Sequence, residues 1–292
     1  MTGRLRVGVD VGGTNTDAVV MAGRSVAASV KVPTTSDVTG GILSALTALF
    51  SGSDLATADV AAVMIGTTHF TNAIVEADGL AATAVIRLGL PATASLPPLV
   101  DWPERLIRAI GGHTYMCRGG HEYDGREIAP LDRENLIRIV ESAARTGIRS
   151  FAISSVFSPV NPDFEQEAAL IIEEIVDDAS VSLSSEIGRI GLLERENATA
   201  LNACLIDLAS RIVDAFEDAV AGFGVNAPLY VSQNDGTLIS ADYARRYPVA
   251  TFASGPTNSM RGAAFLSGLT DCAVVDVGGT TSDVGGLVSG FP

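Results

Sequence analysis

The chain has 292 residues, with 34 acidic and 19 basic side chains and a formal net charge of −15 at pH 7. This balance, with no run of lysine or arginine, disfavours a nucleic-acid-binding function. With 47% hydrophobic and 18% charged residues, the composition predicts a folded protein with a sizeable core. No apolar run reaches the ~18–20 residues of a membrane span. The three cysteines form no Cys-x-x-Cys pair, so we expect reduced thiols in a cytoplasmic protein.

Apolar periodicity predicts strands and helices in alternation along the chain. Strands are expected over residues 5–11, 16–22, 25–32, 60–65, 83–88, 150–157 and 228–232, and the stretch 111–122 is expected to form strands and turns. Helices are expected over about 37–50, 70–77, 132–146, 163–177, 192–221 and 254–266. Ser36 or Asp37 and Asp132 are suitable helix N-caps, and Gly147 suits the position after a helix. The alternation predicts an α/β protein with a mixed sheet.

The most informative feature is an eight-residue phrase that occurs twice. Residues 10–17 read Asp-Val-Gly-Gly-Thr-Asn-Thr-Asp, and residues 276–283 read Asp-Val-Gly-Gly-Thr-Thr-Ser-Asp. Apolar residues flank both copies, so each copy predicts a strand, a tight turn and a second strand. One copy alone is well explained as a β-hairpin with a Gly-Gly turn. A near-identical pair predicts two facing hairpins that clamp a polyphosphate in a cleft.

The residue types in both phrases suit this chemistry. Glycines let the backbone approach an anion closely, and successive amide N–H groups can then point at it, while the threonine hydroxyls add donors. The predicted phosphate-binding residues are Gly12, Gly13, Thr14, Asn15, Thr16, Gly278, Gly279, Thr280 and Thr281. Asp10 and Asp276 suit a hydrated Mg²⁺, which takes few carboxylates and keeps several waters. Asp17 and Asp283 close the two turns, which hairpin geometry explains as well as a metal does.

Three residues are predicted to be catalytic: Asp10, Asp235 and His69. Asp235 follows a predicted strand and precedes a glycine, where a carboxylate would orient a water molecule or accept its proton. An Asx-type turn is the alternative explanation for Asp235. His69 follows two threonines at the end of a predicted strand. It could contact the substrate, bind a metal or be a hydrogen-bonded structural histidine. The early glutamates of the helix from 192, Glu194 and Glu196, suit its dipole without a catalytic role.

Beyond the two hairpins, further segments support a family resemblance. They are Gly66-Thr67-Thr68-His69-Phe70-Thr71-Asn72-Ala73, Ser185-Glu186-Ile187-Gly188, Glu194-Arg195-Glu196-Asn197, Gln233-Asn234-Asp235-Gly236 and Ser254-Gly255-Pro256. With these segments in this order, the chain resembles the hydantoinase/5-oxoprolinase family, and in particular its N-methylhydantoinase A-type subunits. That family belongs to the actin-like ATPase superfamily, whose ribonuclease-H-like lobes hold ATP and Mg²⁺ between two phosphate hairpins.

The resemblance implies ATP-dependent hydrolysis of a cyclic amide such as a hydantoin, 5-oxoproline or a related lactam. An unstrained lactam is a poor electrophile, and phosphorylation of its carbonyl oxygen turns that oxygen into a leaving group. Two amide-lined hairpins and Mg²⁺ would supply the positioning and charge neutralisation that phosphoryl transfer requires. A B-type subunit or domain is expected to complete the site. Whether the chain also forms a homo-oligomer stays open.

The same resemblance implies a domain plan. Residues 1–268 would form a first lobe with an α/β subdomain inserted at about 80–190, and residues 269–292 would form the first hairpin of a truncated second lobe. The chain is therefore expected to be an N-terminal fragment. Where many relatives carry Gln-Ser-Asn-Gly-Gly and Ser-Gly-Pro-Ala-Gly-Gly, this chain differs within 233–237 and 254–259, which leaves the substrate open.

Two other functions share the Asp-x-Gly-Gly-Thr hairpin. A sugar-type small-molecule kinase fits the first hairpin, although the Cys/His zinc cluster of some such kinases is absent. An ATP-driven activator also fits, but those proteins usually ligate an iron–sulfur cluster through closely spaced cysteines. The motifs that follow the first hairpin favour the hydantoinase resemblance over both alternatives.

Overall fold

The structure is a computed structural model that describes residues 5–35, 38–51, 54–277 and 282–292. The chain divides into two compact units. Unit 1 comprises residues 1–72 and 209–292, and unit 2 comprises residues 73–208. In the described part of the chain, no helix has the length and apolar character needed to cross a membrane.

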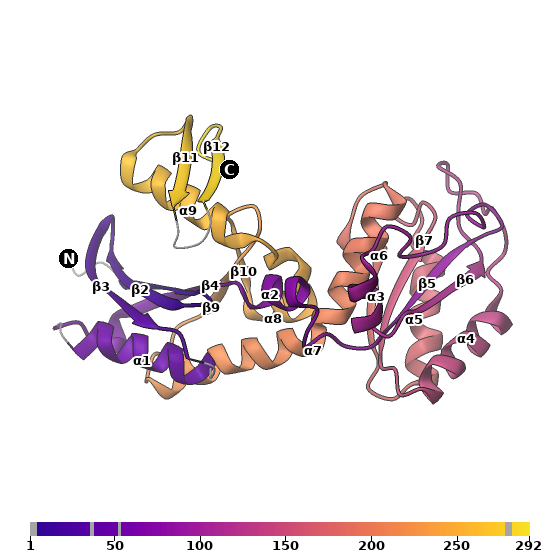
Figure 1. Cartoon of the computed structure of the whole chain (residues 1–292), viewed down its shortest axis with the longest axis horizontal. Coiled ribbons are helices and arrows are strands. Elements are labelled where there is room, and N and C mark those ends of the chain that lie inside the picture. Colours follow the sequence, from indigo (N-terminus) through magenta and orange to yellow (C-terminus); the bar gives the residue numbers. More distant parts are fainter. Residues whose placement is uncertain (1–4, 36–37, 52–53, 278–281) are drawn as a thin grey trace. The chain divides into compact units, whose positions relative to one another are not determined.

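Unit 1 is built on a six-stranded mixed sheet with the strand order β10-β9-β4-β1-β2-β3 (Figure 1). Its strands are β1 (Leu5–Val11), β2 (Asn15–Ala22), β3 (Ser25–Pro33), β4 (Val60–Thr67), β9 (Leu229–Ser232) and β10 (Leu238–Ser240). The first three strands form the predicted antiparallel meander, and β4 and β9 add to it in parallel. The mixed sheet expected from the sequence is therefore confirmed.

Helices and a second small sheet accompany this sheet in unit 1. The helical elements are α1 (Val38–Ser51), the start of α2 (His69–Glu76), the end of α7 (Leu192–Gly222), α8 (Ala241–Arg246), α9 (Ser254–Ser267) and two 3-10 turns, Thr57–Asp59 and Pro248–Thr251. Helix α1 packs against β2 and β3. Alternate residues of β1, among them Val7 and Val9, are buried together with Ile42 and Leu46 of α1. One face of the sheet therefore belongs to the core, which leaves the intervening side chains on the other face.

The second phrase of the sequence forms its own hairpin, β11 (Cys272–Val277) and β12 (Ser282–Leu287). These strands pair only with each other among the described residues, and α9 contacts both of them. Three of their valines, Val275, Val277 and Val284, are exposed. That residues 269–292 begin a second lobe stays a prediction.

Unit 2 contains a four-stranded, fully parallel sheet in the order β6-β5-β7-β8. Its strands are β5 (Thr83–Leu90), β6 (His113–Arg118), β7 (Ser150–Ser155) and β8 (Ser180–Leu183), and its helices include α3 (Glu104–Ala109), α4 (Arg133–Arg145), α5 (Asp163–Ile175) and α6 (Ser184–Ile187). Buried apolar residues of β5 and β7 pack with those of α4 and α5 in one core. As predicted, Asp132 caps α4, because its side chain accepts a hydrogen bond from the Asn135 N–H at 3.0 Å.

Glu196 forms a buried ion pair in unit 2, which the sequence-based interpretation of this residue did not include. Arg87 and Glu196 are almost fully buried, and Arg87 Nε donates to Glu196 Oε2 at 2.7 Å. Ser154 Oγ donates to the same oxygen at 2.7 Å. The early glutamates of α7 were expected to serve only the helix dipole. Glu194 is indeed exposed, but Glu196 compensates a buried guanidinium, which is a packing role that the local sequence does not reveal.

The elements that the sequence did not predict are short. They are α3, β8, α6, β10 and α8, each of three to six residues. Periodicity is a weak signal over so few residues. The predicted N-cap of the first helix, at Ser36 or Asp37, lies outside the described residues.

Candidate functional site

Four residues that are paired across neighbouring strands of the unit 1 sheet form a row, and this row brings charged side chains together. Gly66 of β4 pairs with Asp10 of β1, Asp10 pairs with Asp17 of β2, and Asp17 pairs with Lys31 of β3. Paired residues on neighbouring strands point to the same face of a sheet. Because Val9 and Val11 point into the core, Asp10 and its row must point to the opposite, open face.

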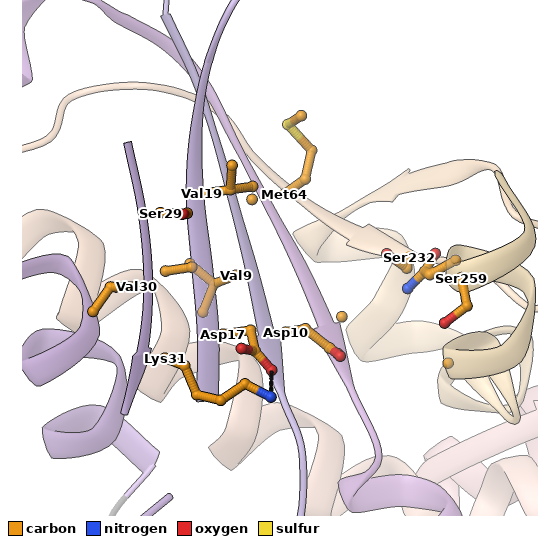
Figure 2. A pocket seen from close by; sticks show the side chains of 15 residues that line it. Val9, Asp10, Asp17, Val19, Ser29, Val30, Lys31, Met64, Ser232 and Ser259 are labelled. Atoms are coloured by element: carbon orange, nitrogen blue, oxygen red, sulfur yellow. Dashed lines mark ion pairs between the residues drawn. The ribbon is translucent and has the colours of Figure 1, made fainter. Parts of the chain in front are cut away.

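That open face forms the floor of a pocket of about 600 Å³ (Figure 2). Figure 2 shows Asp10, Asp17 and Lys31 on adjacent strands, with Ser232 and Ser259 contributed by other elements. The start of α9 contributes Gly255, Asn258 and Ser259 to the lining. The pocket therefore combines two carboxylates, one ammonium group and several uncharged donors on a sheet face next to the first hairpin.

Asp10 is the carboxylate of this pocket whose pKa the surroundings shift. Burial among the surrounding atoms raises the pKa of its carboxyl group above the ordinary value of 3.8, and the nearby carboxylates of Asp17 and Asp276 raise the pKa further. Lys31 opposes these effects and lowers the pKa of Asp10. Although Asp10 is accessible to solvent in the pocket, its negative charge is thus incompletely compensated, and a bound cation would stabilise it.

Gly66 makes this arrangement sterically feasible. A Cβ atom at position 66 would lie 2.9 Å from Asp10 Oδ1 and 2.9 Å from Asn258 Nδ2. Both distances are shorter than real Cβ contacts, so any larger residue would displace the carboxylate or the amide. This gives a physical reason for the glycine that precedes Thr67-Thr68-His69 in the sequence.

The first glycine-rich hairpin turns at Gly12 and Gly13, as predicted. Gly12 N–H donates to the Asn15 carbonyl at 3.1 Å, and a Cβ atom on Gly12 would lie only 3.0 Å from that oxygen. Gly13 and Thr14 are exposed, so this turn is open to a ligand. Thr34 supports the turn from the end of β3, because its hydroxyl donates to the Gly12 carbonyl at 2.8 Å.

The structure corrects one detail of the predicted phosphate site. Thr16 was expected to offer its hydroxyl to the anion, but this residue is fully buried, and its Oγ1 lies 3.1 Å from Thr34 Oγ1. The strand alternation that exposes Asp17 turns Thr16 into the core. The Thr16 hydroxyl therefore supports the turn and does not face the pocket.

The second hairpin repeats the register of the first. Asp276 pairs with Asp283, and Val277 pairs with Ser282, just as Asp10 pairs with Asp17 and Val11 with Thr16. Asp276 Oδ2 accepts a hydrogen bond from Ser259 Oγ at 2.5 Å, which links this hairpin to a residue that lines the pocket. The predicted ligands Gly278, Gly279, Thr280 and Thr281 lie outside the described residues.

The other two predicted catalytic residues are not among the described residues that line the pocket. His69 is half-buried at the start of α2, its Nδ1 lies 2.6 Å from Thr67 Oγ1, and burial lowers the pKa of its imidazole. Asp235 is exposed and accepts hydrogen bonds from the N–H and the hydroxyl of Thr237, at 2.9 and 2.6 Å. These bonds lower the pKa of Asp235 and form the Asx-type turn that was the alternative explanation. Catalytic roles for both residues stay predictions.

The donor set fits a magnesium ion better than a transition metal. Among the described residues, no group of three or more His, Cys, Asp or Glu side chains could enclose a metal. Mg²⁺ needs no such cage, since it is commonly held by one or two carboxylates, waters and substrate phosphates. Asp10, with its incompletely compensated charge, is the side chain that fits this role, and Asp276 is the second candidate.

Comparisons with known proteins agree with this architecture. The chain has a TM-score of 0.79 with a nucleotide-free structure of acetone carboxylase (19% identity, 98% of this chain, 44% of that chain). Its TM-score is 0.77 with an ATP-dependent caprolactamase from Pseudomonas jessenii (24% identity, 96% and 43% of the two chains). The chain thus shares the mixed α/β fold of these two structures, and the α/β class predicted from the sequence is confirmed.

Sequence comparisons identify the family. Residues 6–176 match the hydantoinase/oxoprolinase N-terminal region, and residues 195–292 match the hydantoinase/oxoprolinase model. The chain belongs to the hydantoinase/oxoprolinase family. It is 30% identical to an uncharacterised protein of Methanocaldococcus jannaschii (98% of this chain, 44% of that protein) and 27% identical to the caprolactamase subunit alpha of P. jessenii (96% and 43%). The chain thus spans less than half the length of these curated relatives.

Proposed function

We propose that this chain carries the ATP site of an enzyme that opens a cyclic amide, such as a hydantoin, 5-oxoproline or a related lactam. The observation that carries the proposal is the pocket in which Asp10, two residues before Gly12, lies beside Asp17, with the carboxylate of Asp276 near enough to raise the pKa of Asp10. The similarity to a caprolactamase subunit along 96% of the chain supports a lactam as the substrate class.

The chemistry follows from the low reactivity of an amide carbonyl. In the proposed reaction, the carbonyl oxygen attacks the terminal phosphorus of ATP, and the P–O bond to ADP breaks with its electron pair on ADP. A water molecule then attacks the carbonyl carbon, and the ring C–N bond breaks as the nitrogen takes up a proton. A second water at the same carbon releases the original oxygen with inorganic phosphate. One lactam, one ATP and two waters thus yield the ring-opened amino acid, ADP and phosphate.

The residues of unit 1 have distinct roles in this proposal. The exposed backbone of Gly13 and Thr14 would donate N–H groups to phosphate oxygens, as preorganised donors do in phosphoryl transfer, while Gly12, whose N–H is bonded to the Asn15 carbonyl, shapes the turn. Asp10 would hold a hydrated Mg²⁺, which neutralises phosphate charge when it is bound. Asp276 would approach the same ion from the second hairpin.

The remaining part of the site would come from outside this chain. We infer that residues 269–292 begin a second lobe, because the β11–β12 hairpin repeats the register of β1–β2 and exposes three valines that further strands or helices would cover. A B-type subunit or domain would then bind the cyclic amide. The term "subunit alpha" in the name of the caprolactamase relative supports an assembly with a partner subunit.

Phosphate release by the full-length protein together with its partner subunit tests this proposal. Hydantoin, 5-oxoproline, caprolactam and a linear amide would be supplied in turn with ATP and Mg²⁺. We expect one cyclic amide to stimulate release at least tenfold, Asp10→Asn to abolish the stimulation, and Asp59→Asn, at an exposed carboxylate away from the pocket, to preserve it. If no cyclic amide stimulates release, the proposal fails, and a kinase or ATP-driven activator becomes the better account.

A further inference from the structure

We propose that Lys31 is the cationic ligand of the nucleotide phosphates in this pocket, and that it leaves Asp17 to contact them. This inference rests on the proposed function, since it assumes that the pocket over Asp10 binds ATP. It adds a binding residue on β3, outside both glycine-rich phrases, that no sequence motif of the chain indicated.

The composition of the chain singles out this residue. Lys31 is the only lysine in 292 residues, whereas the chain has 18 arginines. Wherever else this chain places a long cationic side chain, it uses a guanidinium group. Lysine differs from arginine because its ammonium group is a compact point charge with three donors on a flexible stem, and this geometry suits phosphate oxygens that shift during a reaction.

The position of Lys31 agrees with a role in the pocket. Lys31 pairs with Asp17 across β2 and β3, and Asp17 pairs with Asp10 across β1 and β2. The three side chains therefore follow one another across the floor of the pocket, as Figure 2 shows. Among the described residues that line the pocket, Lys31 is the only one with a positive charge.

The charge balance of the pocket requires such a group. Asp10 and Asp17 line the pocket as carboxylates, and no second cation from the described lining residues balances them. A polyphosphate would add several negative charges to this face. A hydrated Mg²⁺ beside Asp10 would balance part of that charge, and Lys31 is the group of the protein that can balance more.

The contact between Lys31 and Asp17 is of a kind that is easily exchanged. Lys31 Nζ lies 3.2 Å from Asp17 Oδ2, while the two side chains are 64% and 48% exposed. Exposed ion pairs of this type contribute little to stability. Asp17 therefore holds the ammonium group at the pocket without fixing it, and a phosphate oxygen can replace the carboxylate as its partner.

A direct test follows the reactivity of the Lys31 amine itself, in the full-length protein with its partner subunit. Lys31 would be acetylated with an amine-reactive reagent in the presence of Mg²⁺ and either a non-hydrolysable ATP analogue or adenosine. Peptide mass spectrometry would measure the rate of acetylation at Lys31 in each sample. Calorimetry on the same samples would establish that the analogue binds. We expect the bound analogue to slow acetylation of Lys31 at least fivefold, and adenosine, which has no phosphates, to leave the rate unchanged.

Variants provide the second measurement. We expect Lys31→Gln to weaken binding of the analogue at least tenfold with an unchanged melting temperature. Arg6→Gln removes an exposed cation from the face of β1 that also carries Asp10. Arg6 does not line the pocket, so this variant should bind the analogue as the wild type does. If the analogue binds but neither protects Lys31 nor depends on it, the inference is overturned while the proposed function stands. If the wild-type protein does not bind the analogue at all, both are overturned.

Discussion

Asp10 and Asp17 lie directly opposite each other on the antiparallel strands β1 and β2, so their two carboxylates lie side by side on the same face of the sheet. Like charges in this arrangement destabilise a sheet. Burial raises the pKa of Asp10, the carboxylates of Asp17 and Asp276 raise it further, and the exposed Lys31 offsets these effects only in part. The sheet thus maintains an unfavourable cluster of charges at the floor of the pocket, which is characteristic of a site that a cation and a ligand complete.

The first prediction is that Asp10→Asn stabilises the ligand-free protein. The amide keeps the shape of the carboxylate and removes its repulsion from Asp17. We expect the free energy of unfolding at pH 7 to rise by a few tenths to about 1 kcal/mol. Urea denaturation of both proteins measures this change, and a destabilised variant would show that Asp10 has a structural role that the geometry does not indicate.

The pH dependence of this gain has a definite sign. Because the pKa of Asp10 is raised in the folded state, the folded protein binds more protons than the unfolded chain between pH 3.8 and the raised value. The wild-type protein therefore loses stability as the pH rises through that window, and Asp10→Asn does not share this loss. The difference between the two proteins should shrink as the pH falls from 7 towards 4, whereas a constant difference would exclude ionisation of Asp10 as its cause.

Gly66→Ala should impair nucleotide binding more than folding. The added Cβ atom would displace the Asp10 carboxylate and the Asn258 amide, which are side chains that can move. We expect at least a tenfold loss of affinity for ATP with Mg²⁺ and little change in melting temperature. Gly222→Ala, at the end of α7, is the matched control and should bind as the wild type does, because the new Cβ would meet no atom within 4 Å beyond its chain neighbours and its own helix backbone.

The buried pair in unit 2 predicts a large coupling energy. Arg87→Met or Glu196→Leu alone leaves a buried charge without a partner, which costs about 3–5 kcal/mol. The double variant leaves neither charge, so it should be destabilised by clearly less than the sum of the single changes. A double-mutant cycle in urea measures this coupling, and additive effects would show that the two charges do not depend on each other.

The N-cap of α4 allows a more modest prediction. Asp132→Ala removes the acceptor for the Asn135 N–H and should cost about 1 kcal/mol of stability. Asp132→Asn keeps an oxygen in the same place and should cost only a few tenths of a kcal/mol. Equal losses in the two variants would mean that the charge of Asp132, and not its hydrogen bond, stabilises the helix.

The hairpins could be predicted from the sequence because their signals are local. Alternating apolar residues and a Gly-Gly turn specify β1 and β2 without reference to the rest of the chain. The same local alternation correctly indicates that Asp10 and Asp17 share a face. It also shows that Thr16 points to the other face, a consequence that the expectation for the Thr16 hydroxyl did not take into account.

The features that could not be predicted depend on contacts between distant segments. Lys31 belongs to no motif, and only the register of β2 and β3 places it beside Asp17. Glu196 has the sequence signature of a helix start, and only the fold brings it to Arg87, which lies 109 residues away. Gly66 appeared within a motif, but its reason, the approach of Asp10 and Asn258, requires three elements to be in place.

The most direct test of this account is calorimetric titration of the full-length protein, with its partner subunit, by ATP and Mg²⁺. The account predicts saturable binding by the wild-type protein and at least a tenfold weaker affinity, or about 1.4 kcal/mol, for Asp10→Asn. Because that variant should be no less stable than the wild type, lost binding would identify the pocket over Asp10 as the ATP site. Equal affinities for the two proteins would contradict the account and place any bound ATP elsewhere.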